Sequence, residues 1–172
     1  EHTDSWLKRL SARLSEPVVR RAVMQAMKIM GGQYVLGRDI GEGLQRGAKH
    51  NDAQTRFSFD MLGEGARTES DAARYLQSYA DAITEIGRHT SETSVYSNNG
   101  ISVKLSALHP RYRYAQHQQV MDELLPRIKK LCLLAQEHHI GLSIDAEESY
   151  RLDISLDLFQ ALAEDPDLKN WQ

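Results

Sequence analysis

The feature that most constrains the fold is a three-residue pattern that occurs three times along the 172-residue chain. Each copy ends a short apolar run with a serine, an apolar residue and a charged residue: Ser58-Phe59-Asp60, Ser102-Val103-Lys104 and Ser143-Ile144-Asp145. Side chains alternate between the two faces of a β-strand. The serine and the charge therefore share one face, and the apolar residue lies on the other, where it suits packing under helices.

The segments around these copies predict an α/β fold. Strands are expected at about 56–60, 101–105 and 141–145, and helices at 15–30, 38–50, 68–87, 121–135 and 154–164. Pro126 lies inside the fourth helix, so we expect a kink or two abutting helices there. Strands that alternate with long helices indicate βαβ units and a parallel sheet.

The first helix, 15–30, has clear expected ends and one apolar face. Ser15 is the expected N-cap, and Gly31 and Gly32 are expected to end the helix. We interpret the methionines of its apolar face as core residues rather than as cofactor contacts; that face consists of Val19, Ala22, Val23, Ala26, Met27 and Met30.

Two α/β architectures remain possible, and the position of the charges favours one of them. A doubly wound sheet covers both faces with helices, which penalises charges near the strand centre. In a (βα)8 barrel of the TIM type, one face points inward, and its residues at the C-terminal strand ends form the floor of the active site. The three charges lie at such ends, so we expect them to converge on one mouth, with the serines one layer below.

The length of the chain indicates an incomplete barrel. A closed barrel has roughly 250 residues, so we expect only the first three of eight strands, with residues 1–55 as a helical pre-barrel segment and 56–172 as the barrel part. Asp60, Asp145 and Glu147 outnumber Lys104 in this pocket. Because uncompensated buried charges are costly, we expect the rest of the protein to supply cations, with arginines favoured.

Composition gives no sign of several classes of function. The net charge is −3 and no long basic run occurs, so nothing indicates nucleic acid as a partner. No stretch approaches the length of a membrane span, and the first ten residues lack a signal-peptide pattern. Cys132 is the only cysteine, which excludes an intramolecular disulfide. Its helical spacing with Ile128 and Leu131 predicts a core position, and a reducing cytoplasm agrees with a free thiol.

Four strings resemble one family. "FDMLGEGA", "GISVKLSALHPRY" and "IDAEES" resemble three motifs of the proline dehydrogenase domain of proline utilization A flavoenzymes, and "MGGQYVLGRDI" resembles the segment before the barrel. The likeness spans roughly 15–172, and the upstream helical segment favours the multifunctional members.

This resemblance implies a distorted (βα)8 barrel that binds FAD and oxidises L-proline to 1-pyrroline-5-carboxylate by hydride transfer to the flavin. In multifunctional members a second, NAD-dependent aldehyde dehydrogenase domain makes glutamate, and some carry a DNA-binding domain. The implied partners are L-proline and a quinone or another electron acceptor. The implied location is the cytoplasm, with peripheral association with the inner membrane and a homo-oligomer both left open.

The resemblance also assigns roles to individual residues. Lys104 matches the lysine that pairs with the substrate carboxylate, and Asp145 matches the catalytic aspartate beside the substrate nitrogen and the flavin, with Ala146 next to it. Asp145 either relays a proton or only orients the nitrogen. The resemblance gives supporting positions in the pocket to Asp60, Glu64 and Glu147, and positions at the mouth to His109 and Arg111.

Three other interpretations remain. Asp60, Asp145, Glu147 and Glu148 could hold Mg²⁺ with Lys104 as the base. Lys104 could instead form a Schiff base, as in aldolases. A non-catalytic module that binds a partner through its N-terminal helices is the third.

Overall fold

The computed structural model describes residues 3–49, 55–169 and 171, with side chains from residue 16 onward. The chain divides into two compact units, residues 1–46 and 47–172. The predicted boundary between the helical segment and the barrel part lies at residue 55. It directly follows residues 50–54, which are outside the described residues. The helices α1 (Thr3–Tyr34) and α2 (Ile40–Lys49) come before the first strand.

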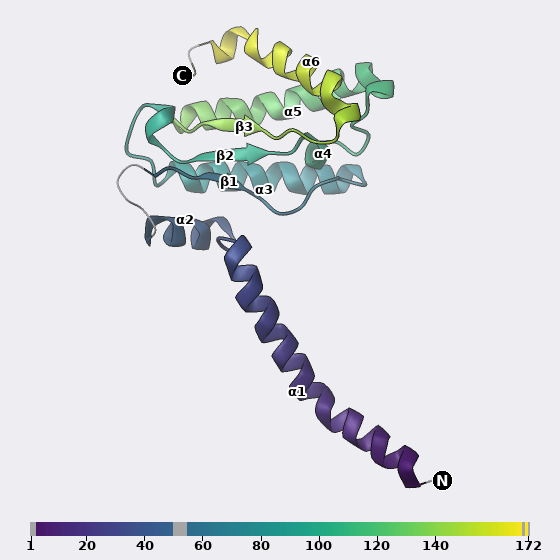
Figure 1. Cartoon of the computed structure of the whole chain (residues 1–172). Helices are drawn as coiled ribbons and strands as arrows, with labels where there is room; N and C mark the ends of the chain where they lie inside the picture. The colour runs from purple at the N-terminus through teal and green to yellow at the C-terminus, as the bar shows by residue number, and fades with distance from the viewer. Residues whose placement is uncertain (1–2, 50–54, 170, 172) are drawn as a thin grey trace. The chain divides into compact units, whose positions relative to one another are not determined.

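A parallel sheet of three strands forms the centre of the second unit (Figure 1). The strands are β1 (Ser58–Asp60), β2 (Gly100–Val103) and β3 (Leu142–Ile144), in the order β1-β2-β3. They alternate with the helices α3 (Glu69–Gly87), α5 (His117–Glu137) and α6 (Leu152–Ala163), as the βαβ prediction requires. A short helix, α4 (Leu105–Leu108), follows β2 directly, and four 3₁₀ helices lie at Val95–Ser97, Tyr114–Gln116, Ser149–Arg151 and Pro166–Leu168.

The sheet has one covered face and one uncovered face. Phe59, Ile101 and Val103 are buried beneath the helices, and α3 and α5 lie along this side of the sheet (Figure 1). Ser58 and Ser143 on the other face are exposed. The predicted division of each strand into an apolar and a polar face is therefore confirmed. The predicted strand 101–105 is shorter, however, because the chain turns into α4 at Leu105.

Helix α3 has the ends that its sequence predicts. The Thr68 side chain accepts a hydrogen bond from the Asp71 amide, and Asp71 accepts one from the Thr68 amide, which makes a capping box. The helix ends at Gly87, where an added Cβ would lie 2.3 Å from the His138 ring. Close packing against His138, the residue that follows α5, therefore requires glycine at this position.

Helix α5 corrects one of the two alternatives expected at Pro126, that of two abutting helices. The helix is continuous from His117 to Glu137, with Pro126 inside it. Leu124 and Ile128, on either side of the proline, are fully buried. Burial of each such side chain contributes about 2 kcal/mol, which offsets a proline penalty of about 3 kcal/mol. Cys132 is buried on the same helix, so its predicted core position is confirmed.

Helix α1 extends past both of its predicted ends. It begins at Thr3, so Ser15 is not its N-cap, and it continues through Gly31 and Gly32 to Tyr34. Each glycine costs a helix only about 1 kcal/mol, which does not force an end. The core interpretation of its apolar face is also wrong for this structure, because more than half of each side chain is exposed at Val19, Val23, Met27 and Met30. No helix among the described residues is long and apolar enough to cross a membrane.

Candidate active site

Lys104 joins the ends of all three strands. It follows β2 in an extended conformation and directly precedes α4. Its ammonium Nζ donates hydrogen bonds to Asp60 Oδ1 at 2.7 Å and to Asp145 Oδ2 at 2.8 Å. The three charged side chains that the serine-and-charge pattern singles out thus meet on the uncovered face, as the strand arrangement predicts. We call Asp60, Lys104 and Asp145 the Lys104 cluster.

The Lys104 cluster is staggered, which the sequence pattern does not reveal. Asp60 lies beside Ser102, and Val103 lies beside Ile144. Asp60 is therefore level with the serine layer of β2, whereas Lys104 and Asp145 lie one layer further along the strands. The prediction that all three charges lie in one layer is wrong for Asp60. The four-carbon stem of lysine allows the ammonium to reach back across this step.

Hydrogen bonds to β2 and to Lys104 hold both the backbone and the side chain of Asp145. Its amide donates to the carbonyl of Val103 at 3.0 Å, which extends the ladder between β2 and β3. The Ser102 hydroxyl donates to Asp145 Oδ1, while Oδ2 accepts from Lys104. The serine layer thus orients the carboxylate, and about a quarter of that side chain remains exposed.

Hydrogen bonding within the Lys104 cluster favours the charged forms. Partial burial opposes charge on Lys104, but the hydrogen bonds to Asp145 and Asp60 outweigh this effect and raise the pKa of Lys104 above its ordinary value. Partial burial likewise opposes charge on Asp145, but the hydrogen bonds from Lys104 and Ser102 lower the pKa of that carboxyl. At neutral pH both side chains are therefore ionised.

Glu147 does not join the Lys104 cluster but pairs with a cation that the sequence interpretation missed. Its Oε2 atom accepts from Arg151 Nη1 at 2.5 Å, and both side chains are largely buried. Arg151 also pairs with Glu148 at 3.1 Å and lies over the Tyr112 ring, 5.3 Å from its centroid. One expected cation thus comes from this chain. The four-residue spacing between Glu147 and Arg151 was a usable signal.

Ser106 connects the loops that follow the three strands. Its amide donates to Glu147 Oε1 at 2.9 Å. Its hydroxyl accepts from the Gly65 amide at 3.2 Å, and its carbonyl accepts from the Ala66 amide at 2.8 Å. Glu64, beside Gly65, is exposed, and the structure gives its side chain no hydrogen bond to a described residue. The sequence could not single out Ser106, because two of these contacts use its backbone.

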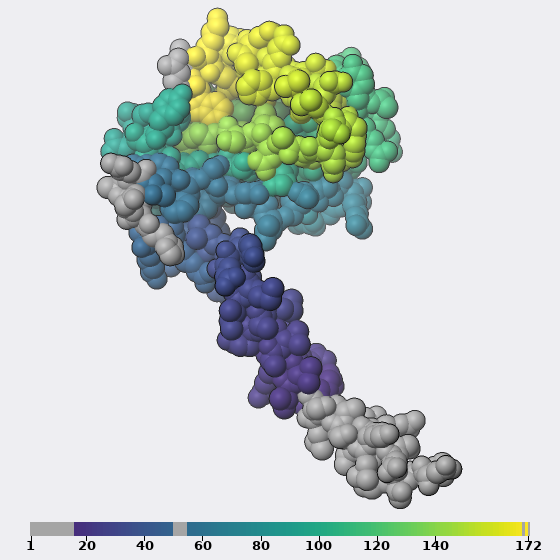
Figure 2. All heavy atoms as spheres, viewed as in Figure 1, coloured from purple at the N-terminus to yellow at the C-terminus, as the bar shows by residue number. Residues whose placement is uncertain are grey.

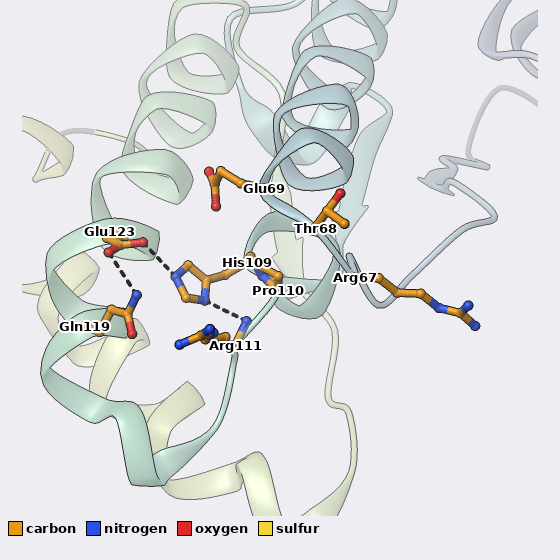
Figure 3. Close-up of a pocket in the computed structure, with 8 residues that line it drawn as sticks. All are labelled: Arg67, Thr68, Glu69, His109, Pro110, Arg111, Gln119 and Glu123. Atoms are coloured by element: carbon orange, nitrogen blue, oxygen red, sulfur yellow. Dashed lines mark hydrogen bonds and ion pairs between the residues drawn. The ribbon is translucent and has the colours of Figure 1, made fainter.

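His109 contributes to a different place, a pocket of about 380 Å³ (Figure 3). Its buried ring contacts Glu123 Oε2 through Nε2 at 3.1 Å and accepts from the Arg111 amide through Nδ1 at 3.1 Å. The residues that line the pocket are Arg67, Thr68, Glu69, His109, Pro110, Arg111, Gln119 and Glu123. The structure therefore brings His109 to α5 and does not bring it to Lys104.

The contacts of Lys104 argue against two of the other interpretations, the magnesium site and the Schiff base. The ammonium occupies the space between the Asp60 and Asp145 carboxylates. Within the described part of the chain, no group of three or more histidine, cysteine, aspartate or glutamate residues could hold a metal ion. A Schiff base requires an unprotonated amine, whereas the raised pKa of Lys104 keeps it protonated.

Comparison with known proteins identifies the family of this chain. The chain matches the proline dehydrogenase family over residues 43–172. It is 48% identical to the bifunctional protein PutA of Escherichia coli over 165 residues, which is 96% of this chain and 12% of that protein. The PutA of Rhizobium meliloti is also 48% identical, over 95% of this chain and 13% of that protein. The chain thus spans about an eighth of the length of these relatives.

Solved structures give the same result. A variant of Bradyrhizobium japonicum proline utilization A matches with a TM-score of 0.74 and 48% identity, over 95% of this chain and 17% of that one. Proline utilization A from Bdellovibrio bacteriovorus matches with a TM-score of 0.80 over 90% of this chain and 17% of that one; at 21% identity, this likeness concerns the fold alone. With the family match covering three quarters of its residues, the chain belongs to the proline dehydrogenase family.

Proposed function

We propose that this chain is part of an enzyme that oxidises L-proline to 1-pyrroline-5-carboxylate with FAD. The observation that carries the proposal is the Lys104–Asp145 pair on the uncovered face, at the carboxyl ends of two neighbouring parallel strands. Barrel enzymes carry their active sites at such ends. We further propose that the three strands are the first of a (βα)8 barrel whose inner face is the uncovered face.

The two side chains complement the two charges of proline. Lys104 supplies an ammonium for the substrate carboxylate, and the ionised Asp145 supplies an acceptor for the ring nitrogen. Both are fixed by hydrogen bonds, to Asp60 for Lys104 and to Ser102 for Asp145. A substrate held at both charges adopts one orientation, which places the carbon next to nitrogen at a defined point.

The residues near Asp145 fit a flat cofactor. Ala146 is small and exposed, and Ser143 on the same edge of the sheet is exposed as well. Asp145 and Ala146 would hold the cofactor on this side. Bound FAD would supply the hydride acceptor. The ionised Asp145 would orient the substrate nitrogen and would be the nearest group to take its proton.

The proposal extends to the whole protein of which this chain would be a part. It includes a quinone or another electron acceptor for the reduced flavin, an NAD-dependent second domain, and a cytoplasmic location or a peripheral one at the inner membrane.

Substitution of Lys104 in the full-length protein tests the proposal. Lys104→Ala should raise the KM for proline about 30- to 150-fold, because a charged hydrogen bond contributes about 2–3 kcal/mol. Lys129→Ala is a matched control, because Lys129 also bridges two carboxylates, Asp165 and Asp167, at 2.7 Å each, away from the Lys104 cluster. The measurements are the visible spectrum of the flavin and proline-dependent reduction of a dye. A colourless or inert wild-type protein, or an unchanged KM for Lys104→Ala, would contradict the proposal.

A further inference from the structure

The Lys104 amide lies beyond the last residue of β1 that could pair with it in the sheet. The Gly100 amide donates to the carbonyl of Phe57, the residue just before β1, at 2.8 Å. In a parallel ladder this contact repeats every second residue, so the Lys104 amide would need an acceptor at Met61. Strand β1 has already ended at Asp60. Without a substitute, this amide would remain unpaired beside the Lys104 cluster, which is costly for a partly buried group.

A tyrosine from the helical layer supplies that substitute. Tyr79 lies in the middle of α3, on the covered side of the sheet, and is completely buried. Its hydroxyl oxygen accepts a hydrogen bond from the Lys104 amide at 3.2 Å. The Lys104 side chain extends to the uncovered face, where it meets Asp60 and Asp145. Lys104 is therefore held from both sides of the sheet at the point where β2 turns into α4.

The electrostatic surroundings place Tyr79 close to the Lys104 cluster. Burial raises the pKa of Tyr79, the Lys104 amide and ammonium lower it, and the charges of Asp60 and Asp145 raise it further. The phenol is therefore neutral at neutral pH and can act as a hydrogen-bond acceptor for the backbone. An apolar side chain of the same shape would pack equally well but would leave the amide without a partner.

We propose that Tyr79 is a positioning residue for substrate binding, acting through the backbone of Lys104. The hydroxyl fixes the main chain at the end of β2, and this sets the point from which the ammonium reaches the substrate carboxylate. The proposal rests on the proposed function, since it assigns to Lys104 the carboxylate of L-proline. Tyr79 itself contacts no reacting group.

Tyr79→Phe in the full-length protein tests the proposal, because it removes only the hydroxyl. The KM for L-proline should rise roughly three- to tenfold, with kcat changed less than about twofold, because the lost contact affects binding in the ground and transition states alike. Amide hydrogen exchange at Lys104 should become about tenfold faster or more. Ile154→Val is the control for a general loss of stability, because Ile154 is completely buried in α6 and far along the chain from Lys104.

A double-mutant cycle separates positioning from a purely structural role. If Tyr79 acts through Lys104, Tyr79→Phe should have no further effect on KM once Lys104 is alanine. An equal rise in KM in both backgrounds, or kinetics equal to those of Ile154→Val, would overturn the inference. If the wild-type protein does not oxidise L-proline, the proposed function fails, and unchanged exchange at Lys104 in Tyr79→Phe would then separately overturn the positioning role.

Discussion

The two carboxylates that hold Lys104 differ in their surroundings. Asp145 also accepts from Ser102 and is 26% exposed in its side chain, whereas Asp60 is 46% exposed and lies one layer below. Exposed ion pairs contribute at most about 1 kcal/mol. Asp60→Asn should therefore raise the KM for proline less than about fivefold, whereas Asp145→Asn should lower kcat/KM more than about 100-fold. Steady-state kinetics on both variants will measure the contrast, and equal losses would contradict the assigned roles.

The pKa shifts within the Lys104 cluster predict how stability depends on pH. Folding lowers the pKa of Asp145, so the ionised carboxylate stabilises the fold at pH values above 3.8, the ordinary pKa of the group. This contribution is lost as pH falls through the folded-state pKa. Folding raises the pKa of Lys104, so the protonated ammonium stabilises the fold at pH values below 10.5, the ordinary pKa of the group. This contribution is lost as pH rises through the folded-state pKa. The difference in thermal midpoint between wild type and Asp145→Asn should thus be constant from about pH 5 to about pH 9 and shrink below about pH 4. A difference that grows in acid would contradict this sign.

Residues of the site differ in how far the sequence reveals them. The meeting of Asp60, Lys104 and Asp145 follows from strand alternation and parallel order, both of which are visible in the sequence. The one-layer step of Asp60 is not visible, because register depends on which residues of neighbouring strands pair. Tyr79 escapes sequence interpretation for a further reason: its hydroxyl contacts a backbone amide 25 residues away in the chain.

Among the elements, two glycines with opposite surroundings give a paired prediction. An added Cβ at Gly100 in β2 would lie 2.7 Å from the Gly141 carbonyl oxygen, whereas one at Gly31 in α1 would meet nothing within 4 Å. Gly100→Ala should lower the free energy of unfolding by about 1–3 kcal/mol. Gly31→Ala should raise the stability of its helix by about 0.5–1 kcal/mol. Denaturant titration monitored by circular dichroism checks both, and a stable Gly100→Ala variant would show that the strands can separate there.

The loops after the strands depend on the buried pair of Glu147 and Arg151. The Glu147 side chain is 10% exposed and that of Arg151 is 17% exposed. Loss of one partner of a buried pair costs about 3–5 kcal/mol, so Arg151→Met should destabilise the protein by roughly 3 kcal/mol. Glu148→Gln is the control, because Glu148 is 57% exposed and pairs with the same arginine; it should cost less than about 1 kcal/mol. Equal losses in thermal or denaturant unfolding would mean that the pair is not structurally important.

The order of the three strands and three long helices in the second unit could be predicted, but several of their ends and the short helix α4 could not. The capping box at Thr68 and the glycine at the end of α3 are local signals, so both ends of that helix are predictable. Helix α4 replaces the expected end of β2, because the β1 partner stops at Asp60 while Ser106 bonds to the neighbouring loops. Such long-range contacts leave no periodic signal in the sequence.

At the scale of the whole molecule, the described chain has large apolar surfaces. Beyond the exposed face of α1, several apolar side chains of α6 are exposed, and this helix lies on the surface of the second unit (Figure 2). Groups of exposed apolar side chains such as these are typical of surfaces that contact other protein. The curated relatives are about eight times as long as this chain.

Residues 1–172 produced alone should therefore differ from the full-length protein. They should be colourless, should not oxidise proline, and should bind a hydrophobic dye such as ANS strongly. The full-length protein should be yellow and should bind the dye weakly. A flavin spectrum or proline turnover from residues 1–172 alone would show that the site needs no further strands.

The staggered position of Asp60 also determines how many hydrogen-bond donors Lys104 can offer a ligand. An ammonium carries three N–H donors. Asp60 engages one from the layer below, and Asp145 engages another from the neighbouring strand. Among the described residues the structure gives this ammonium no third acceptor, so under the proposed function a substrate carboxylate would bind without displacing either aspartate. Lys104 would thus keep its contacts with both aspartates while its ammonium makes one further hydrogen bond to the bound substrate.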